Sequence, residues 1–195
     1  MSKYKPTDFI GYETSYLGEE SMRNNVRLIV PFFRNEGWTD NAIAGMLGNM
    51  QTESSINPNL WQGREIPADP TTTDKGYGLT QWTPARKLIT WAEVEGLNYT
   101  SGFAQMFRIK YERENNVQWS TNNILNYTWD DYVVSTESPE ILARVFVWAY
   151  ERPEDPNIEK RQQDARKWFN FMHSWQFNKP PWLLFKFNER RGFLK

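Results

Sequence analysis

The chain has 195 residues and a net charge of −1, aromatic residues make up 16% of it, and it contains one histidine and no cysteine. This composition provides enough apolar bulk for one folded domain, but it excludes a cysteine nucleophile, a cysteine-and-histidine zinc site and an overall basic field for binding nucleic acid. The groups left for catalysis are carboxylates, followed by lysine and tyrosine, and we expect no cofactor and no metal.

Residues 1–20 have no regular hydrophobic period, and we expect them to form an irregular N-terminal arm. They also lack the apolar centre of a secretory signal peptide. The longest apolar runs, such as LIVPFF and PPWLLF, are too short to span a membrane. We therefore expect the chain to be made in a cytoplasm without a signal peptide, and not to insert stably into a membrane.

Two helices are predicted next in the chain. The first starts near Ser21, and because Pro31 interrupts its pattern we expect a kinked helix or two short ones. Thr39 is a suitable N-cap for the second helix, which we expect to end at Asn57 and Pro58. Its apolar residues have the spacing i, i+3, i+4, i+7 of one buried face: Ile43, Met46, Leu47 and Met50.

Residues 59–82 are rich in Pro, Gly, Thr and Asp, and they predict loops with a short β-hairpin. A third helix follows, with Thr83 as its cap, Pro84 in its first turn and Gly96 at its end. Further helices are predicted over 101–113, near Asp130, over the strongly apolar 138–153 and over 164–175.

These elements predict one mostly helical α+β domain over residues 21–175, with a loop and short β-hairpin as an insert. Residues 176–195 differ in composition, because aromatic and basic residues accompany Pro180 and Pro181. We expect this C-terminal tail to dock on a partner protein, and contact with a membrane surface is the alternative.

Glu53 is the acid of most interest in the second helix. At about 100° of rotation per residue, it lies on the shoulder of the buried face, in the last turn. Partial burial and the negative end of the helix dipole both favour a carboxyl that keeps its proton, as a general acid for glycosidic-bond cleavage must. The alternative is a solvated surface residue. The polar side chains around Glu53, among them Ser54, could form hydrogen bonds with a sugar.

Three stretches together resemble the phage tail lysozyme family: AIAGMLGNMQTESSINP, GYGLTQWTPARK and FVWAYERP. The resemblance covers roughly residues 22–175. It implies a lysozyme-like fold in which Glu53 is the catalytic acid and the segment with Gly78, Leu79 and Gln81 lies across the cleft. It also implies a muramidase in the virion, at the tail tip or knob, that opens host peptidoglycan during DNA entry. Glu151 departs from the Ala-Tyr-Asn segment of the related lytic transglycosylases.

A glycosidase normally needs a second carboxylate, and the loop contains Glu65, Asp69 and Asp74. We favour Asp74, because it precedes the segment that returns to the cleft, and Asp69 is the next choice. If neither lies near Glu53, polar side chains could position the water. Alternatively, the 6-hydroxyl of the sugar could attack C1, as in lytic transglycosylases, with Glu53 as acid and then base.

Aromatic residues flank the same loop and could bind the apolar faces of sugars. We expect Trp61 and Tyr77 to be exposed, whereas Trp82 is either a platform or a core residue. Gln81 could bond to an N-acetyl group or brace Glu53. Tyr150 either points into the cleft or is a buried structural residue.

The residues and the resemblance together predict an enzyme that cleaves the β-1,4 bond between N-acetylmuramic acid and N-acetylglucosamine. The expected partners are peptidoglycan glycan strands and, through the tail, other phage tail proteins, with no nucleic acid. The competing interpretation is a plug or binding protein that keeps the fold without catalysis.

Overall fold

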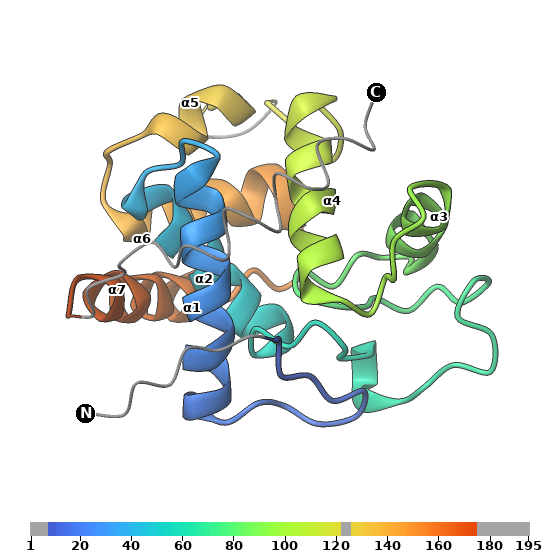
Figure 1. Ribbon diagram of the computed structural model, residues 1–195. Helices are drawn as coiled ribbons and strands as arrows, with labels where there is room; N and C mark the ends of the chain where they lie inside the picture. The colour runs from blue at the N-terminus through green and yellow to red at the C-terminus, as the bar shows by residue number, and fades with distance from the viewer. Residues whose placement is uncertain (1–7, 122–125, 175–195) are drawn as a thin grey trace.

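The computed structural model describes residues 8–121 and 126–174, and these form a mostly helical domain (Figure 1). The elements in chain order are α1 (Glu19–Asn35), α2 (Asp40–Ser54), the short 3-10 helix η1 (Gln62–Arg64), α3 (Arg86–Val94), α4 (Gly102–Glu114), α5 (Trp129–Val134), α6 (Pro139–Phe146), the π-helical turn η2 (Val147–Glu151) and α7 (Ile158–Ser174). The predicted C-terminal tail, 176–195, lies outside the described residues.

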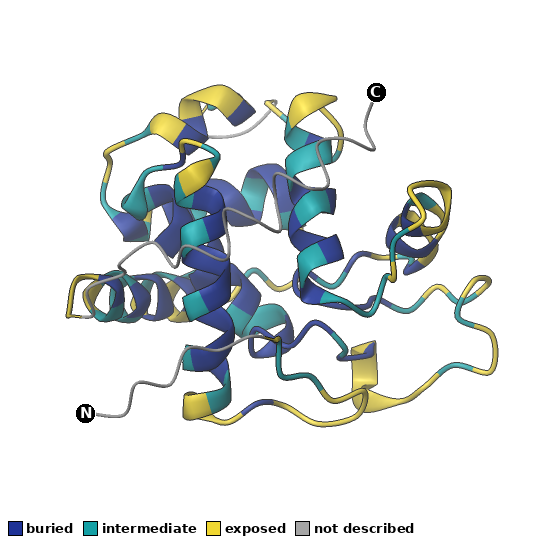
Figure 2. Cartoon of the chain, viewed as in Figure 1, coloured by how far each residue is buried: buried dark blue, intermediate teal, exposed yellow. Residues whose placement is uncertain are grey.

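α2 is the central helix of the domain, and it is buried along most of its length (Figure 2). It packs mainly against α7 and α6, and also against α1 and α5. Its start is the predicted one, because the Thr39 side chain accepts a hydrogen bond from the amide of Ala42. All four residues of the predicted apolar face, Ile43, Met46, Leu47 and Met50, are fully buried.

Two glycines of α2 explain how closely its neighbours approach. A Cβ on Gly45 would lie 2.8 Å from the backbone carbon of Leu142 in α6. A Cβ on Gly48 would lie 2.4 Å from the carbonyl oxygen of Arg161 in α7. Neither distance is possible between real atoms, so any larger residue would push the helices apart. The glycines thus allow α7 to approach the end of α2 that carries Glu53.

Two predicted helix starts are wrong by a few residues. α3 begins at Arg86, because Thr83 uses its hydroxyl to bond the carbonyl of Gln81 and so does not cap the helix. α7 begins at Ile158, one and a half turns before the predicted start at residue 164. The added turn is polar, so the apolar period gave no sign of it. α1 runs through Pro31 as one helix.

The insert between α2 and α3 extends away from the helical body (Figure 1). The predicted β-hairpin is not confirmed there. Among residues 8–121 and 126–174, β pairing outside named strands is limited to two isolated bridges, in which Tyr77 pairs with Trp61 and with Trp82. The insert is therefore a loop pinned at one aromatic residue.

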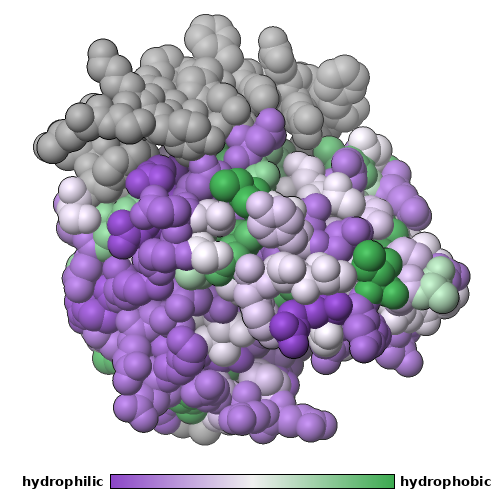
Figure 3. Space-filling model, turned by 90° about the horizontal axis from the view of Figure 1, so that it is seen from below, coloured by the Kyte–Doolittle hydropathy of each residue, from purple (hydrophilic) through white to green (hydrophobic). Residues whose placement is uncertain are grey.

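The surface of the domain is mostly hydrophilic on the face drawn in Figure 3, where hydrophobic residues occur in small groups. Among the helices of the described residues, none has both the length and the apolar character needed to cross a membrane.

Candidate active site

A cavity of about 690 Å³ opens beside Glu53, and we call it the Glu53 cavity. Its wall combines the end of α2 with the insert and with the segment around η2. Outside α2, its lining residues are Tyr16, the insert residues Leu60, Trp61, Gln62, Gly63, Thr80, Gln81, Trp82 and Thr83, and Lys87, Gln118, Tyr150, Glu151, Arg152, Pro153 and Glu154. Glu53 and Gln81, which the sequence placed at one groove, both line this cavity.

The Glu53 carboxylate is held by a buried arginine. The Glu53 side chain is 18% exposed, and its Oε1 lies 2.6 Å from Nη2 of Arg161, whose side chain is 3% exposed. Arg161 also donates to the side-chain oxygen of Asn49 at 3.0 Å and to the carbonyl of Pro156 at 2.7 Å. Because these bonds fix the guanidinium, they also fix the Glu53 carboxylate at the cavity wall.

Sequence reasoning missed Arg161, because it lies in the first turn of α7, which was not predicted. A signal for it does exist. Arg161 continues the spacing of the buried residues Ala165, Trp168 and Met172 one turn toward the start of the helix. A charged residue at such a position is buried only where a partner is available.

Glu151 is the second carboxyl at this wall, although the sequence singled it out only as a departure from a family pattern. It ends the π-helical turn η2, and the next residue, Arg152, has a left-handed backbone with φ of 52°. Its Oε1 is buried and has no hydrogen-bond partner among residues 8–121 and 126–174. Burial, and then the adjacent charge of Glu53, raise the pKa of Glu151 well above its ordinary value. The protonated form of Glu151 is therefore more favoured than that of an ordinary glutamate.

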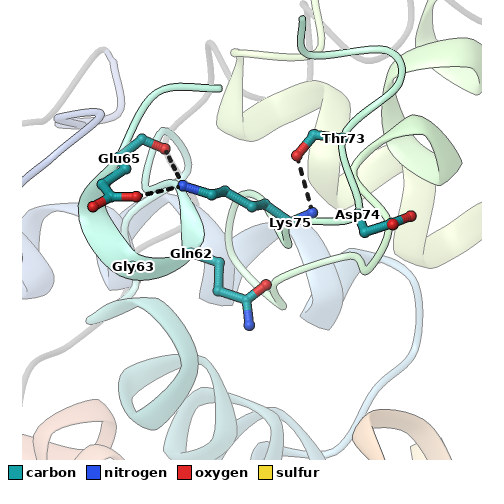
Figure 4. A pocket seen from close by; sticks show the side chains of 6 residues that line it. All are labelled: Gln62, Gly63, Glu65, Thr73, Asp74 and Lys75. Carbon is teal, nitrogen blue, oxygen red and sulfur yellow. Dashed lines mark hydrogen bonds and ion pairs between the residues drawn. The ribbon is translucent and has the colours of Figure 1, made fainter. Parts of the chain in front are cut away.

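The structure does not bring Asp74 or Asp69 into the Glu53 cavity, so the expectation that one of them faces Glu53 is wrong. Asp74 is 98% exposed and lies 3.9 Å from Arg86. It lines a separate open hollow with Glu65 and Lys75, in which Lys75 reaches toward Glu65 and the Asp74 carboxylate points away (Figure 4). Asp69 stabilises a turn by accepting bonds from the amide and hydroxyl of Thr71 at 2.8 and 2.7 Å.

Gln81 lies at the cavity wall in a left-handed backbone conformation with φ of 50°. Its side-chain amide donates to the carbonyls of Leu60 at 2.9 Å and Gly78 at 3.0 Å. Because both N–H bonds are used, the side-chain oxygen is the group that can accept a hydrogen bond from a ligand. Gln81 is thus fixed by the insert and is not bonded to Glu53.

The rest of the Gly-x-x-Gln segment is structural. Gly78 has φ of 83°, and a Cβ there would meet the side chain of Gln105 at 2.6 Å, so only glycine fits. Leu79 is buried, and its carbonyl accepts a bond of 2.9 Å from the hydroxyl of Ser54. Ser54 is fully buried as well. It therefore braces the insert against α2 and is not available to a sugar, contrary to expectation.

The aromatic residues predicted to bind sugar are buried. Trp61 and Tyr77, expected to be exposed, are each 1% exposed, and their rings pack at 4.4 Å. Trp82 donates from its indole nitrogen to Glu112 at 3.0 Å, and the Tyr150 hydroxyl donates to the same carboxylate. Trp82 and Tyr150 therefore form a fixed floor of the cavity, as the structural alternative for each of them predicted.

Glu112 anchors this floor and was not identified from the sequence. It is fully buried in α4 and pairs with Arg108 at 2.8 Å. Burial raises its pKa, and the charge of Arg108 and the three hydrogen bonds act against that rise. Residues 8–121 and 126–174 hold no cluster of three or more acidic or histidine side chains able to bind a metal ion.

Comparisons with known proteins identify a family for the chain. A family model described as phage tail lysozyme matches residues 24–172. Morphogenesis protein 1 of Bacillus phage B103 is 43% identical to the chain over 157 residues, which cover 80% of the chain and 41% of that protein. The chain therefore spans about two fifths of the length of this relative.

Proposed function

The chain belongs to the phage tail lysozyme family, and from this premise we propose that it is a muramidase. In this proposal it cleaves the β-1,4 bond between N-acetylmuramic acid and N-acetylglucosamine and so opens the host cell wall during DNA entry. The observation that carries the proposal is the pair of neighbouring carboxyls, Glu53 and Glu151, with Arg161 at the wall of one cavity.

The pair is the source of the proton in this proposal. The charge of Glu53 opposes ionisation of the neighbouring Glu151, so in this proposal the two carboxyls hold one proton between them. Without a ligand, Glu53 pairs with Arg161 and the proton resides on Glu151. When a glycan fills the cavity, Glu53 takes up the proton and delivers it to the bridging oxygen, whose bond to C1 breaks.

Arg161 then stabilises the Glu53 carboxylate that this transfer produces, because the guanidinium is already in place at 2.6 Å. A water molecule attacks C1 and returns its proton to the carboxyl pair. The sugar leaves with a free reducing end, and the site recovers its starting charge.

A lytic transglycosylase is the second candidate, and one observation favours it. Among the described residues, the carboxyls at the cavity are Glu53, Glu151 and Glu154, and the insert contributes none. Because the raised pKa of Glu151 disfavours its ionised form, Glu151 is poorly suited to be the ionised partner of a hydrolase. A mechanism with Glu53 as acid and then base, and with attack by the 6-hydroxyl of the sugar, is compatible with this arrangement.

The test is cell-wall degradation by the wild type and by Glu53→Gln. Glutamine keeps the size of the side chain and removes the acid, so we expect the rate to fall by roughly 100- to 10,000-fold. Equal clearing of a peptidoglycan gel by both proteins would reject Glu53, and no clearing by either would favour a non-catalytic plug. Mass spectrometry of the fragments separates hydrolysis, with reducing ends, from transglycosylation, with 1,6-anhydro ends.

The same family supports a place in the virion, and we propose the tail tip, where the enzyme would meet the cell wall. The relative from phage B103 bears the name of a morphogenesis protein, in keeping with a structural component of the particle. The proposed partners are peptidoglycan strands and neighbouring tail proteins.

A further inference from the structure

Tyr16 is the exposed aromatic ring of the Glu53 cavity. It belongs to the N-terminal arm before α1 and is 60% exposed. The three other aromatic residues at the cavity, Trp61, Trp82 and Tyr150, are all buried. Of the aromatic rings in the described part of the chain that line this cavity, Tyr16 alone has a surface open to a ligand.

The backbone on both sides of this ring is anchored to the segment that follows Glu53. The amide of Leu17 donates to the hydroxyl of Ser55 at 2.9 Å, and the carbonyl of Ser15 accepts a bond of 2.8 Å from the side chain of Asn57. Ser55 and Asn57 are themselves buried. The polar residues after Glu53 therefore hold the arm, and the position of Tyr16 does not depend on a flexible chain.

A cation steadies the ring itself. The guanidinium carbon of Arg64, in η1, lies 5.4 Å from the centre of the Tyr16 ring. Arg64 covers part of the ring, and the 60% exposure of Tyr16 leaves the remainder open. A ring that is exposed but already positioned loses little conformational freedom when a ligand binds.

We propose that Tyr16 is a sugar-binding platform, whose ring stacks on the apolar C–H face of an amino-sugar unit of the bound glycan. This inference rests on the proposed function, since it takes the glycan as the ligand. The platform residues expected in the insert, Trp61 and Tyr77, are buried. The inference assigns that role to Tyr16, which precedes Glu53 in the chain.

The test is binding of an N-acetylglucosamine hexamer, measured by calorimetry, to the full chain carrying Glu53→Gln so that no cleavage occurs. In this background we expect Tyr16→Ala to weaken binding by about three- to tenfold. Tyr16→Phe keeps the ring and should bind within about twofold of the parent. Tyr12 is an exposed tyrosine on the same arm, 56% exposed, that does not line the cavity, so Tyr12→Ala is the matched control and should have no effect.

A second measurement uses the active protein. In that protein Tyr16→Ala should raise KM for peptidoglycan and leave kcat nearly unchanged, because stacking acts on the ground state and the transition state alike.

Unchanged binding by Tyr16→Ala, an equal loss in Tyr12→Ala, or no binding of the hexamer at all would overturn the inference. Binding that depends on Tyr16, without any cleavage of cell wall by the wild type, would uphold the platform and reject the enzyme.

Discussion

At the scale of single residues, the site is defined by the balance of charge around Arg161. Glu53 contacts the guanidinium directly, whereas Glu151 lies beside the pair with a buried oxygen that has no partner among the described residues. Burial and the charge of Glu53 raise the pKa of Glu151 although the charges of Arg161 and Arg152 act against that rise, so Glu151 is the carboxyl that favours the proton. The activity of the site should therefore depend on pH through the pair and not through Glu53 alone.

Glu151→Gln should change the pH profile of activity. The variant lacks the carboxyl whose pKa is raised, so the site should lose its proton at lower pH than in the wild type. We expect the alkaline limb of the activity profile to move toward acid pH. Glu154 is exposed at the same cavity, and Glu154→Gln is the control that should leave the limb in place. An unmoved limb in Glu151→Gln would contradict a shared proton.

Glu151→Gln should also stabilise the fold at neutral pH. The raised pKa means that the folded state keeps a proton that the unfolded chain has lost, so wild-type stability falls as the pH rises above the ordinary glutamate pKa of about 4.3. Glutamine does not ionise and avoids this loss. We expect the variant to melt roughly 2–4 °C above the wild type at pH 7, the effect of about 1 kcal/mol, and close to it at pH 4.

Glu112→Gln should have the opposite effect on stability from Glu151→Gln. Glu112 is also buried with a raised pKa, but it is the ion-pair partner of the buried Arg108. Its replacement leaves that cation uncompensated, which destabilises a fold by about 3–5 kcal/mol. Thermal unfolding of both variants across pH 4–8 measures the expected stabilisation by Glu151→Gln and the expected destabilisation by Glu112→Gln. Destabilisation by Glu151→Gln at pH 7 would refute a proton on Glu151.

At the scale of elements, the site depends on how closely α7 approaches α2. Gly48→Ala would place a methyl group 2.4 Å from the carbonyl oxygen of Arg161 and 2.7 Å from the amide of Ala165, both of them backbone atoms. α7 must shift, and we expect a loss of about 1–3 kcal/mol in unfolding free energy together with loss of cell-wall cleavage. Gly18→Ala, where a methyl group meets no atom within 4 Å, is the control. Equal activity of both variants would show that cell-wall cleavage does not depend on the close contact between α2 and α7 at Gly48.

The sequence was sufficient for elements with a strong apolar period and clear caps. Thr39 and α2 are examples, and Ser138 begins α6 as predicted, with Pro139 in its first turn. It failed where polar residues replace apolar ones at buried positions. The first turn of α7 is buried through Arg161, and that burial makes sense only beside Glu53, 108 positions away in the chain. No local sequence pattern predicts a contact between residues so far apart in the chain.

The same limit explains the errors at the site. Glu53 and Gln81 could be recognised from the resemblance, and both lie at the cavity. Exposure of Trp61 and Tyr77 could not be judged, because these residues of an otherwise irregular insert pack on each other and into the hydrophobic core. Tyr16 was overlooked for the converse reason: an arm without any period is held in place by buried polar bonds to Ser55 and Asn57.

At the scale of the whole molecule, the cavity draws on the N-terminal arm, α2, the insert and η2, so its shape depends on segments that are far apart in the chain. The lining residues that the structure describes lie between residues 16 and 154, and the predicted tail over residues 176–195 lies outside the described residues. Catalysis and attachment to the particle should therefore separate, the first residing in the helical domain and the second in the aromatic and basic tail.

Deletion of residues 176–195 tests this division. We expect the truncated chain to cleave purified cell wall at nearly the wild-type rate, because Glu53, Glu151 and Arg161 remain in place. Its incorporation into particles should fall, since aromatic side chains in a short proline-interrupted segment require a partner surface for burial. Quantitative blotting of purified particles measures incorporation, and clearing of peptidoglycan measures activity. Replacement of the tail by a Gly/Ser segment of equal length controls for length. Full incorporation of the chain with the Gly/Ser segment, or loss of cleavage with normal incorporation, would contradict this division. Either result would show that the tail does not attach the catalytic domain to the particle.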